Sequence, residues 1–479
     1  MLAGVMLAGC KQDEPGRDDP QDNPSMHRDL DYLFDMRSVP HITLTLTEAD
    51  WNTYLRNYDK NSQNSEYVPA AFSFTKDGET YTRDSVGLRP RGNTSRVRPE
   101  SRTGKMHEDG AQFHRAHFGI RFTNYETGQR FFGVDRLILK RNKDDPTYCH
   151  EVFSYDLFHR FGVWSAPRAS YCRLTIYIQG DTKPVYMGVY SMIENPRKGW
   201  LDSRYHAGNI PDKKGNMWKA VFGANLSEVN MSKMGISDDE SSNSFCYSLK
   251  TNKSDLASAQ AELCDFINGL INHAPGSPEL KSWLEEHIDV DLLLRTYAVN
   301  VMVGSWDDYW KNTNNYLFYF DSNHRFYFIP YDYDNTLGTA MEVERMPGYT
   351  PPPPGVELPD YGNPGTADML RWGKEDKLLM SRVLSIESYM ETYKSYIKQI
   401  ATSSDLMSPD AAKIRVQEIQ ALIGPYVAND TESEASSTIT DKPASWSTCP
   451  KYRLLSGGVG DGITSESNFF DTKVASIYW

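Results

Sequence analysis

The sequence predicts an α+β protein with two lobes, and three observations support this. The chain has 479 residues, which is more than one compact domain usually contains. Residues 29–195 are rich in short runs of strand-forming residues with alternating apolar positions. Residues 196–430 instead place most apolar side chains three and four positions apart, as amphipathic helices do. We therefore expect a strand-rich N-terminal lobe and a mainly helical C-terminal lobe, with residues 431–479 as a weakly patterned extension.

The N-terminal lobe is predicted to consist mostly of strands. They are expected at residues 41–46, 86–95, 118–122, 136–140, 172–178 and 185–194. Thr47 is a suitable N-cap for a short helix around Trp51–Tyr58. A longer helix is expected over Asp145–Phe161, because an Asp-Pro pair opens it and Gly162 follows its last apolar position.

The C-terminal lobe is predicted to be helical, with one strand hairpin. The helical spacing covers residues 255–271, 278–303, 376–401 and 408–427. The hairpin consists of Tyr316–Phe320 and the strand that begins at Phe326, joined by a polar turn. The Pro- and Gly-rich segment 346–365 is expected to be a long surface loop, and we hypothesise that its prolines, Pro351–Pro354, border the substrate entrance.

Charge and the N-terminal segment limit the partners of the chain. A net charge of −13 and a pI near 5.4 argue against nucleic-acid binding, which needs clustered Lys and Arg. Leu7-Ala8-Gly9-Cys10 resembles a bacterial lipoprotein signal, and the polar residues up to position 28 are typical of a flexible tether. The expected location is therefore outside the cytoplasm, on the periplasmic face or the cell surface, with attachment to the membrane through a lipidated Cys10.

The remaining cysteines give no sign of a metal or redox motif. They are Cys149, Cys172, Cys246, Cys264 and Cys449. Their number is odd and no two have CxxC spacing, so a zinc site is not expected. We expect buried thiols, although a location outside the cytoplasm permits disulfides.

A pair of aspartates follows the aromatic strand FYFIPYDYDNTLG, at Asp332 and Asp334. Three chemistries use similar carboxylates: a DxDxT phosphatase, a DxDxDG calcium loop and the metal-binding aspartate of a phosphoryl-transfer enzyme. A polar turn without catalytic chemistry is the alternative. The calcium loop lacks its glycine and its distal glutamate, and the alternating βα pattern of the phosphatase fold is absent.

The segment upstream favours phosphoryl transfer. Protein kinases place a magnesium-binding Asn five residues after the catalytic Asp, and a hairpin then leads to a second, metal-binding Asp. Asp307 and Asn312 have that spacing, whereas Asn315 directly precedes the strand, as the kinase Asn does. Both asparagines are therefore candidate metal ligands. An Asn-rich surface loop is the alternative.

Several stretches, in order from Val86 to Gly338, resemble the spore-coat protein H (CotH) kinase family. These are residues 88–95, 118–122, 188–194, 216–219, 305–307, 315–316 and 329–334, closing on Gly338. The resemblance implies an atypical, two-lobed kinase-like fold that transfers the γ-phosphoryl group of ATP with Mg²⁺. It is most specific as an ordered set, because each stretch is short.

The resemblance also implies roles for individual residues. Asp307 would be the catalytic base, and Asn312, Asn315, Asp332 and Asp334 would be candidate metal ligands. Arg91, Asn93, Arg121, Glu194 and Lys219 would be candidates for nucleotide contacts. Lys140 and Glu151 are candidates for the Lys–Glu ion pair of kinases, or for a pair of solvated charges.

The expected substrate is the Ser/Thr hydroxyl of a protein in the cell envelope. A non-catalytic surface scaffold on the same fold is the main alternative. The segment Arg115–Phe122, RAHFGIRF, favours that alternative because the family more often has a lysine-rich strand there, and Arg does not simply replace a phosphate-binding Lys.

Overall fold

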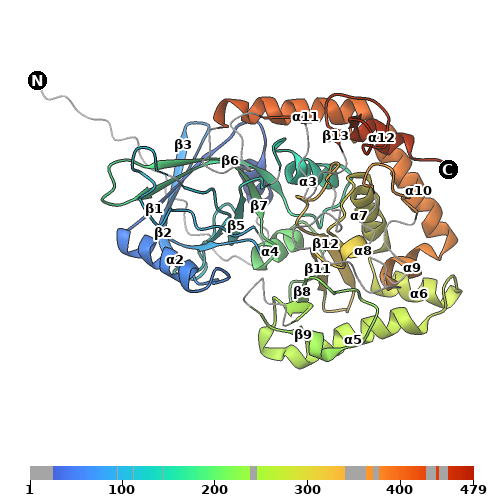
Figure 1. Ribbon diagram of the computed structural model, residues 1–479. Helices are drawn as coiled ribbons and strands as arrows, with labels where there is room; N and C mark the ends of the chain where they lie inside the picture. The colour runs from blue at the N-terminus through green and yellow to red at the C-terminus, as the bar shows by residue number, and fades with distance from the viewer. Residues whose placement is uncertain are drawn as a thin grey trace, which may run out of the picture. The chain divides into compact units, whose positions relative to one another are not determined.

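The computed structural model describes residues 25–93, 95–111, 113–143, 145–237, 245–339, 363–370, 377–427, 439–441 and 451–479. The chain divides into two compact units, each made of three segments (Figure 1). The first unit comprises residues 1–141, 170–195 and 425–437, and the second comprises residues 142–169, 196–424 and 438–479. The predicted lipoprotein signal with Cys10, the prolines Pro351–Pro354 and Cys449 lie outside the described residues.

The first unit is built around a closed seven-stranded barrel, which the sequence did not predict. The strand order around it is β1-β2-β3-β4-β5-β7-β6. The strands are β1 (His41–Leu46), β2 (Val68–Lys76), β3 (Glu79–Pro90), β4 (Phe118–Arg121), β5 (Arg136–Lys140), β6 (Ala169–Ile178) and β7 (Val185–Glu194). Neighbouring strands from β1 to β5, and β5 with β7, are antiparallel. The barrel closes where β1 pairs with β6 in parallel, with His41 opposite Arg173.

Alternating side chains fill the interior of the barrel. In β1 every second residue is buried, so Ile42, Leu44 and Leu46 point inward. Phe72 of β2 packs edge-on against Phe122 and Phe131, with ring centres 5.2 and 5.0 Å apart. Within the described residues, the α-helices of this unit are α1 (Ser25–Phe34) and α2 (Glu48–Lys60). The predicted strand-rich N-terminal region is thus confirmed.

The second unit contains a five-stranded sheet with the order β12-β11-β8-β10-β9. Its strands are β8 (Asn216–Ala220), β9 (Met234–Gly235), β10 (Tyr247–Leu249), β11 (Tyr316–Phe320) and β12 (Phe326–Pro330). The predicted hairpin is present as β11 and β12, but the expectation that it stands alone is wrong, because β8 pairs with β11 along its whole length. Phe326 stacks on Phe266 of helix α5 (Leu256–Asn272), with ring centres 4.6 Å apart.

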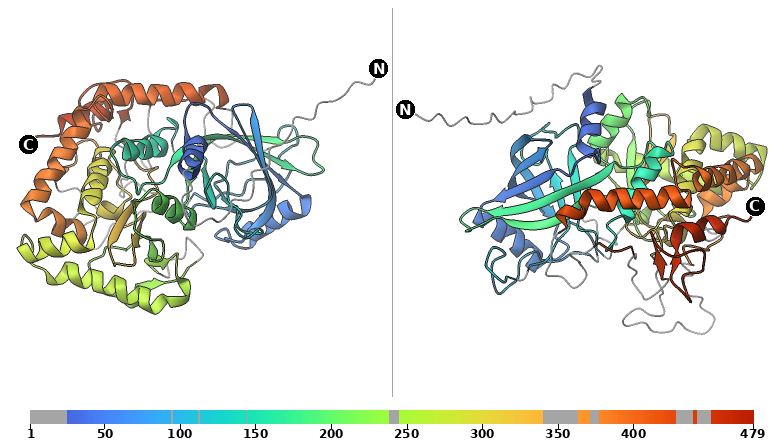
Figure 2. Two further views of the ribbon diagram at one scale, coloured as in Figure 1. Left: turned by 180° about the vertical axis from the view of Figure 1, so that it is seen from behind. Right: turned by 90° about the horizontal axis from the view of Figure 1, so that it is seen from above.

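Helices make up most of the rest of the second unit. They are α3 (His150–Arg160), α4 (Lys198–His206), α5 (Leu256–Asn272), α6 (Pro278–His287), α7 (Val290–Met302), α8 (Tyr309–Asn312), α9 (Leu378–Leu384), α10 (Glu387–Thr402), α11 (Pro409–Ile423) and α12 (Phe469–Ala475). Two short strands, β13 (Tyr452–Arg453) and β14 (Ser467–Asn468), pair in parallel. The buried helix α7 packs against α3 and α10, and Figure 2 shows α10 running beside it.

Two of the predicted helices are each divided in the structure. The helix expected over 278–303 is interrupted at Ile288, which is extended, and Asp289 then caps α7 by accepting a hydrogen bond from the N–H of Leu292 at 3.1 Å. The helix expected over 376–401 is likewise interrupted at Ser385 and Ile386. Helical spacing on both sides of a one- or two-residue break looks continuous in a sequence.

The four described cysteines, at positions 149, 172, 246 and 264, are free thiols. Burial raises the pKa of Cys149 and of Cys172, so both stay protonated at neutral pH. Within the described residues, no helix has both the length and the apolar character needed to cross a bilayer.

Candidate functional site

Asp307 lies in the second unit, in the loop between α7 and α8, and three asparagine side chains hold its carboxylate. The amide of Asn312 donates to one oxygen at 2.6 Å and that of Asn314 donates to the same oxygen at 3.1 Å. The amide of Asn315 donates to the other oxygen at 2.9 Å and to the backbone carbonyl of Asp307 at 3.0 Å. These contacts fix the direction of the carboxylate without adding a charge.

The protonation of Asp307 reflects competing influences. Burial raises its pKa above the ordinary value, and the nearby charge of Asp332 acts in the same direction. The amide hydrogen bonds oppose the shift because they stabilise the carboxylate. A carboxylate with a raised pKa is a better proton acceptor than an exposed one, as general-base chemistry requires.

The next residue, Asp308, supports the loop rather than the site itself. Its carboxylate caps α8 by accepting from the N–H of Lys311 at 2.8 Å. Its backbone carbonyl accepts from the N–H groups of Asn312 and Asn314, at 3.1 and 3.0 Å. Burial raises the pKa of Asp308 to about 6. Asn312 and Asn314 are therefore held by their backbone N–H groups as well as by their side-chain amides.

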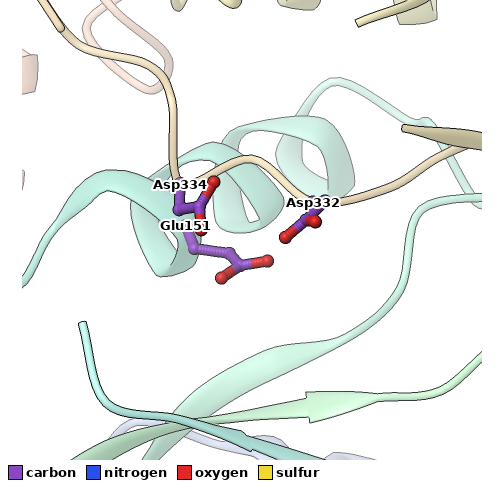
Figure 3. Close-up of side chains that lie close together, drawn as sticks. All are labelled: Glu151, Asp332 and Asp334. Carbon is purple, nitrogen blue, oxygen red and sulfur yellow. The ribbon is translucent and has the colours of Figure 1, made fainter. Parts of the chain in front are cut away.

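A second acidic cluster follows β12, where the chain carries Asp332 and Asp334. One carboxylate oxygen from each of these residues, together with one from Glu151 of α3, lies within 4.8 Å of the other two. Figure 3 shows the three carboxylates facing one another, with Glu151 on the helix and both aspartates on the loop. Hard oxygen ligands in this arrangement fit Mg²⁺, which usually takes one or two carboxylates from a protein.

Helix α3 also holds the backbone of this loop. The hydroxyl of Tyr155 accepts a hydrogen bond from the N–H of Asp332 at 3.0 Å. The Nδ1 atom of His150 lies 2.8 Å from the carbonyl oxygen of Asp334. Asp332 has a φ of +68°, a conformation that an ordinary residue adopts at a cost and that clusters at functional sites. The helix therefore supplies the third acid and holds the backbone that carries the other two.

Both acidic segments belong to one site. Asn335 follows Asp334 directly, and its amide comes within 3.5 Å of the Asp307 carboxylate. Lys219 of β8 lies near the second segment. Its ammonium is 5.0 Å from the ring centre of Tyr331, the residue before Asp332. Lys219 is buried opposite Leu317 of β11.

The predicted metal ligands are divided between the two segments. Asp332 and Asp334 lie together, as a shared metal site requires. Asn312 and Asn315 both direct their amide nitrogens at Asp307, so their visible role is to orient that carboxylate. A part for either asparagine in metal binding stays a prediction.

The four other residues predicted to contact the nucleotide lie in the first unit. Arg91 follows β3 with a buried side chain, and Asn93 is exposed in the next turn. Arg121 ends β4, with its guanidinium 5.9 Å from the ring centre of Tyr67. Glu194 ends β7 and is buried. Their nucleotide contacts stay predictions.

The sequence did not indicate Glu151 as a member of this acidic cluster. It suggested Glu151 only as a partner for Lys140, whereas the structure puts its carboxylate beside Asp332 and Asp334. One signal was present: Glu151 falls in the first turn of a helix, where the helix dipole favours a negative charge. That signal does not reveal which distant segment faces the helix.

The comparison with protein families agrees with this geometry. Residues 88–452 match the family described as CotH kinase protein, and this range includes all of Glu151, Lys219, Asp307, Asp332 and Asp334. The chain belongs to the CotH kinase protein family. Its predicted family membership is thereby confirmed.

Similar curated proteins come from a fungus and a bacterium. The chain is 22% identical over 403 residues to Spore coat protein homolog 1 of Rhizopus delemar, covering 82% of this chain and 54% of that protein. It is 23% identical over 337 residues to Invasin CotH7 of Rhizopus delemar, covering 67% and 51%. It is 25% identical over 303 residues to Inner spore coat protein H of Bacillus subtilis, covering 63% and 71%. The chain thus spans about half the length of the fungal relatives.

Proposed function

We propose that this chain is an ATP-dependent kinase that transfers the γ-phosphoryl group to a Ser or Thr hydroxyl of a protein, with Mg²⁺ as cofactor. The observation that carries the proposal is the pairing of two acidic groups in one unit. Asp307 is a half-buried, amide-held carboxylate, and Glu151, Asp332 and Asp334 form a separate cluster next to it. A positioned base beside a cation site is what phosphoryl transfer to a hydroxyl requires.

Each group has a distinct task in this proposal. Asp307 orients the substrate hydroxyl and accepts its proton as the oxygen attacks, and the surrounding amides keep the carboxylate in position. Glu151, Asp332 and Asp334 would hold Mg²⁺, whose charge neutralises the phosphate oxygens. Lys219 would add a positive charge near the same loop. Arg91, Asn93, Arg121 and Glu194 of the first unit are proposed to contact the nucleotide.

The names of two relatives and the N-terminal segment support our proposals for the substrate class and the location. Two relatives are named spore coat proteins, and we propose that the substrate here is likewise a protein of the cell envelope. Attachment of the chain to a membrane through a lipidated Cys10, outside the cytoplasm, belongs to the same proposal.

A non-catalytic scaffold is the alternative favoured by one observation, the Arg-containing strand around Arg121 in place of a lysine-rich one. The DxDxT phosphatase has less support. Its fold needs a parallel, doubly wound sheet. In the part of the chain that the structure describes, the strand before Asp332 instead pairs antiparallel with β11 at the edge of a small sheet.

The test is calorimetric titration of the protein with ATP in the presence of Mg²⁺. We expect binding by the wild type and its loss in the Asp332→Ala, Asp334→Ala double variant. Asp265→Ala, which removes an exposed acid of α5, is the matched control and should bind as the wild type does. Asp307→Asn should bind ATP but lose turnover by about 10²- to 10⁴-fold. A folded wild type that binds no ATP at millimolar concentration would refute the kinase and favour the scaffold.

A further inference from the structure

Alternate residues of the two acidic segments point in opposite directions. Asp307 faces its three asparagines, whereas Asp308, the next residue, is buried on the other side of the loop. In the second segment Asp332 and Asp334 face Glu151, whereas Tyr333 between them is buried and packs edge-on against Phe158 of α3, at 4.8 Å between ring centres. Each segment therefore has one side chain in the interior behind the site.

Both interior side chains meet at one residue, Asn300 of α7. The hydroxyl of Tyr333 donates to the amide oxygen of Asn300 at 2.7 Å. The amide nitrogen of Asn300 donates to the carboxylate of Asp308. Asn300 is only 3% exposed, and it borders a cavity of about 10 Å³ that Asp308, Asn315 and Tyr333 also line. The amide oxygen of Asn300 is thus bonded to the segment that carries Asp332 and Asp334, and its amide nitrogen to the segment that carries Asp307.

We infer that Asn300 is a positioning residue that sets the spacing between the loop that carries Asp307 and the loop that carries Asp332 and Asp334. The inference rests on the proposed function in so far as the two loops act in one reaction. An amide suits this place because it accepts from one neighbour and donates to the other, whereas a carboxylate or an alkyl group does only part of this. Its neighbours are fully buried, so each lost bond leaves a polar atom without water to replace it.

Helix α7 gives Asn300 a rigid support. Most of its side chains between Val290 and Met302 are buried. The backbone carbonyl of Asn300 also accepts from the N–H of Ser305 at 3.2 Å, and the carbonyl of Val303 accepts from the N–H of Leu337 at 2.8 Å. The end of α7 thus contacts the chain just before Asp307 and just after Asp334. A shift of about 1 Å between such groups can reduce a rate by about 100-fold.

Reciprocal exchange of two residues tests this inference. In Asp308→Asn alone, the new amide oxygen still accepts from the N–H of Lys311, so its NH₂ group faces the NH₂ group of Asn300. Turning the amide of Asn300 over relieves this, but the hydroxyl of Tyr333 then has no acceptor. Asn300→Asp alone puts two carboxylates face to face. The double variant Asn300→Asp, Asp308→Asn restores a complete network, since the new carboxylate at position 300 accepts from both the new amide and Tyr333.

Two properties are measured for each variant: kcat with ATP and a protein substrate, and the affinity for Mn²⁺ alone by electron paramagnetic resonance. We expect each single variant and Asn300→Leu to lower kcat by about 100-fold and Mn²⁺ affinity by about 10-fold, with a smaller change in KM for ATP. The double variant should regain most of both losses. Thr296→Val, one turn earlier on α7 and bordering the same cavity, is the control that should change neither.

The two proposals fail in different ways. Wild-type protein that binds Mn²⁺ but transfers no phosphoryl group would refute the proposed kinase, while Mn²⁺ affinity would still test the role of Asn300. Near-wild-type kcat and Mn²⁺ affinity in Asn300→Leu would overturn the inference. So would a double variant no better than the two single variants, or an equal loss in Thr296→Val, because these results would reduce Asn300 to a general packing role.

Discussion

Replacing Glu151 by Gln should change the stability of the protein in opposite directions with and without a divalent metal. Two unit charges 4.8 Å apart repel by about 3 kcal/mol at an effective dielectric constant of about 20, and the ammonium of Lys219 beside Tyr331 offsets part of this. The variant removes the repulsion of Glu151 from both Asp332 and Asp334. We therefore expect the metal-free variant to unfold with a free energy about 1 kcal/mol or more above that of the wild type.

With metal present the order should reverse. A ligand at 100 times its dissociation constant stabilises the folded wild type by about 2.7 kcal/mol, and the variant should lose most of this gain because a weaker oxygen ligand replaces a charged one. The assay is thermal unfolding in Mg²⁺ and in a chelator, with Asp265→Asn on α5 as the matched control for loss of an exposed acid. A Glu151→Gln protein that is less stable than the wild type in chelator and keeps the full gain from Mg²⁺ would refute the metal site.

Three further predictions concern other parts of the chain. Gly215→Ala should lower the free energy of unfolding by about 1–3 kcal/mol, since its Cβ would collide with the carbonyl of Phe320, whereas Gly458→Ala, with open space, should be neutral in the same denaturant titration. Burial lowers the pKa of His41, so the stability that neutral His41 contributes is lost as pH falls below about 6.5. His41→Gln should therefore unfold with a flatter pH dependence between pH 7 and 5, and an unchanged slope would contradict this. Cys246 should react first with a thiol reagent in the native protein, because the other described cysteines are buried; mass spectrometry of the labelled peptides would reveal a different order.

Local pattern was enough to predict several elements of the fold. The strands β5 and β7 have the predicted limits, because short apolar runs ended by polar residues define them. The hairpin Tyr316–Phe320 and Phe326–Pro330 was also recognised, since its aromatic strands flank a polar turn. The closure of the barrel was not, because the parallel pairing of His41 with Arg173 joins residues far apart in the sequence and leaves no local mark.

The same distinction applies to the site. The sequence placed Asp307, Asp332 and Asp334 in one mechanism, because each follows a recognisable helix or strand and family motifs surround them. It did not reveal Glu151 or Asn300, whose parts depend on which faces of α3 and α7 point at those loops. Helical spacing identifies a buried face but does not name the residue across from it.

The interleaved path of the chain has a consequence for its synthesis. Glu151 is made about 180 residues before Asp332, in a segment that lies between two stretches of the barrel unit. At a translation rate of about 5–20 residues per second, roughly 10–40 s pass before the ribosome supplies the other two acids. A nascent chain that ends between residues 195 and 331 therefore carries a finished set of barrel strands but only one of the three clustered acids. A C-terminal fragment that begins after residue 195 would likewise lack Glu151, so neither half of the chain contains all three acids.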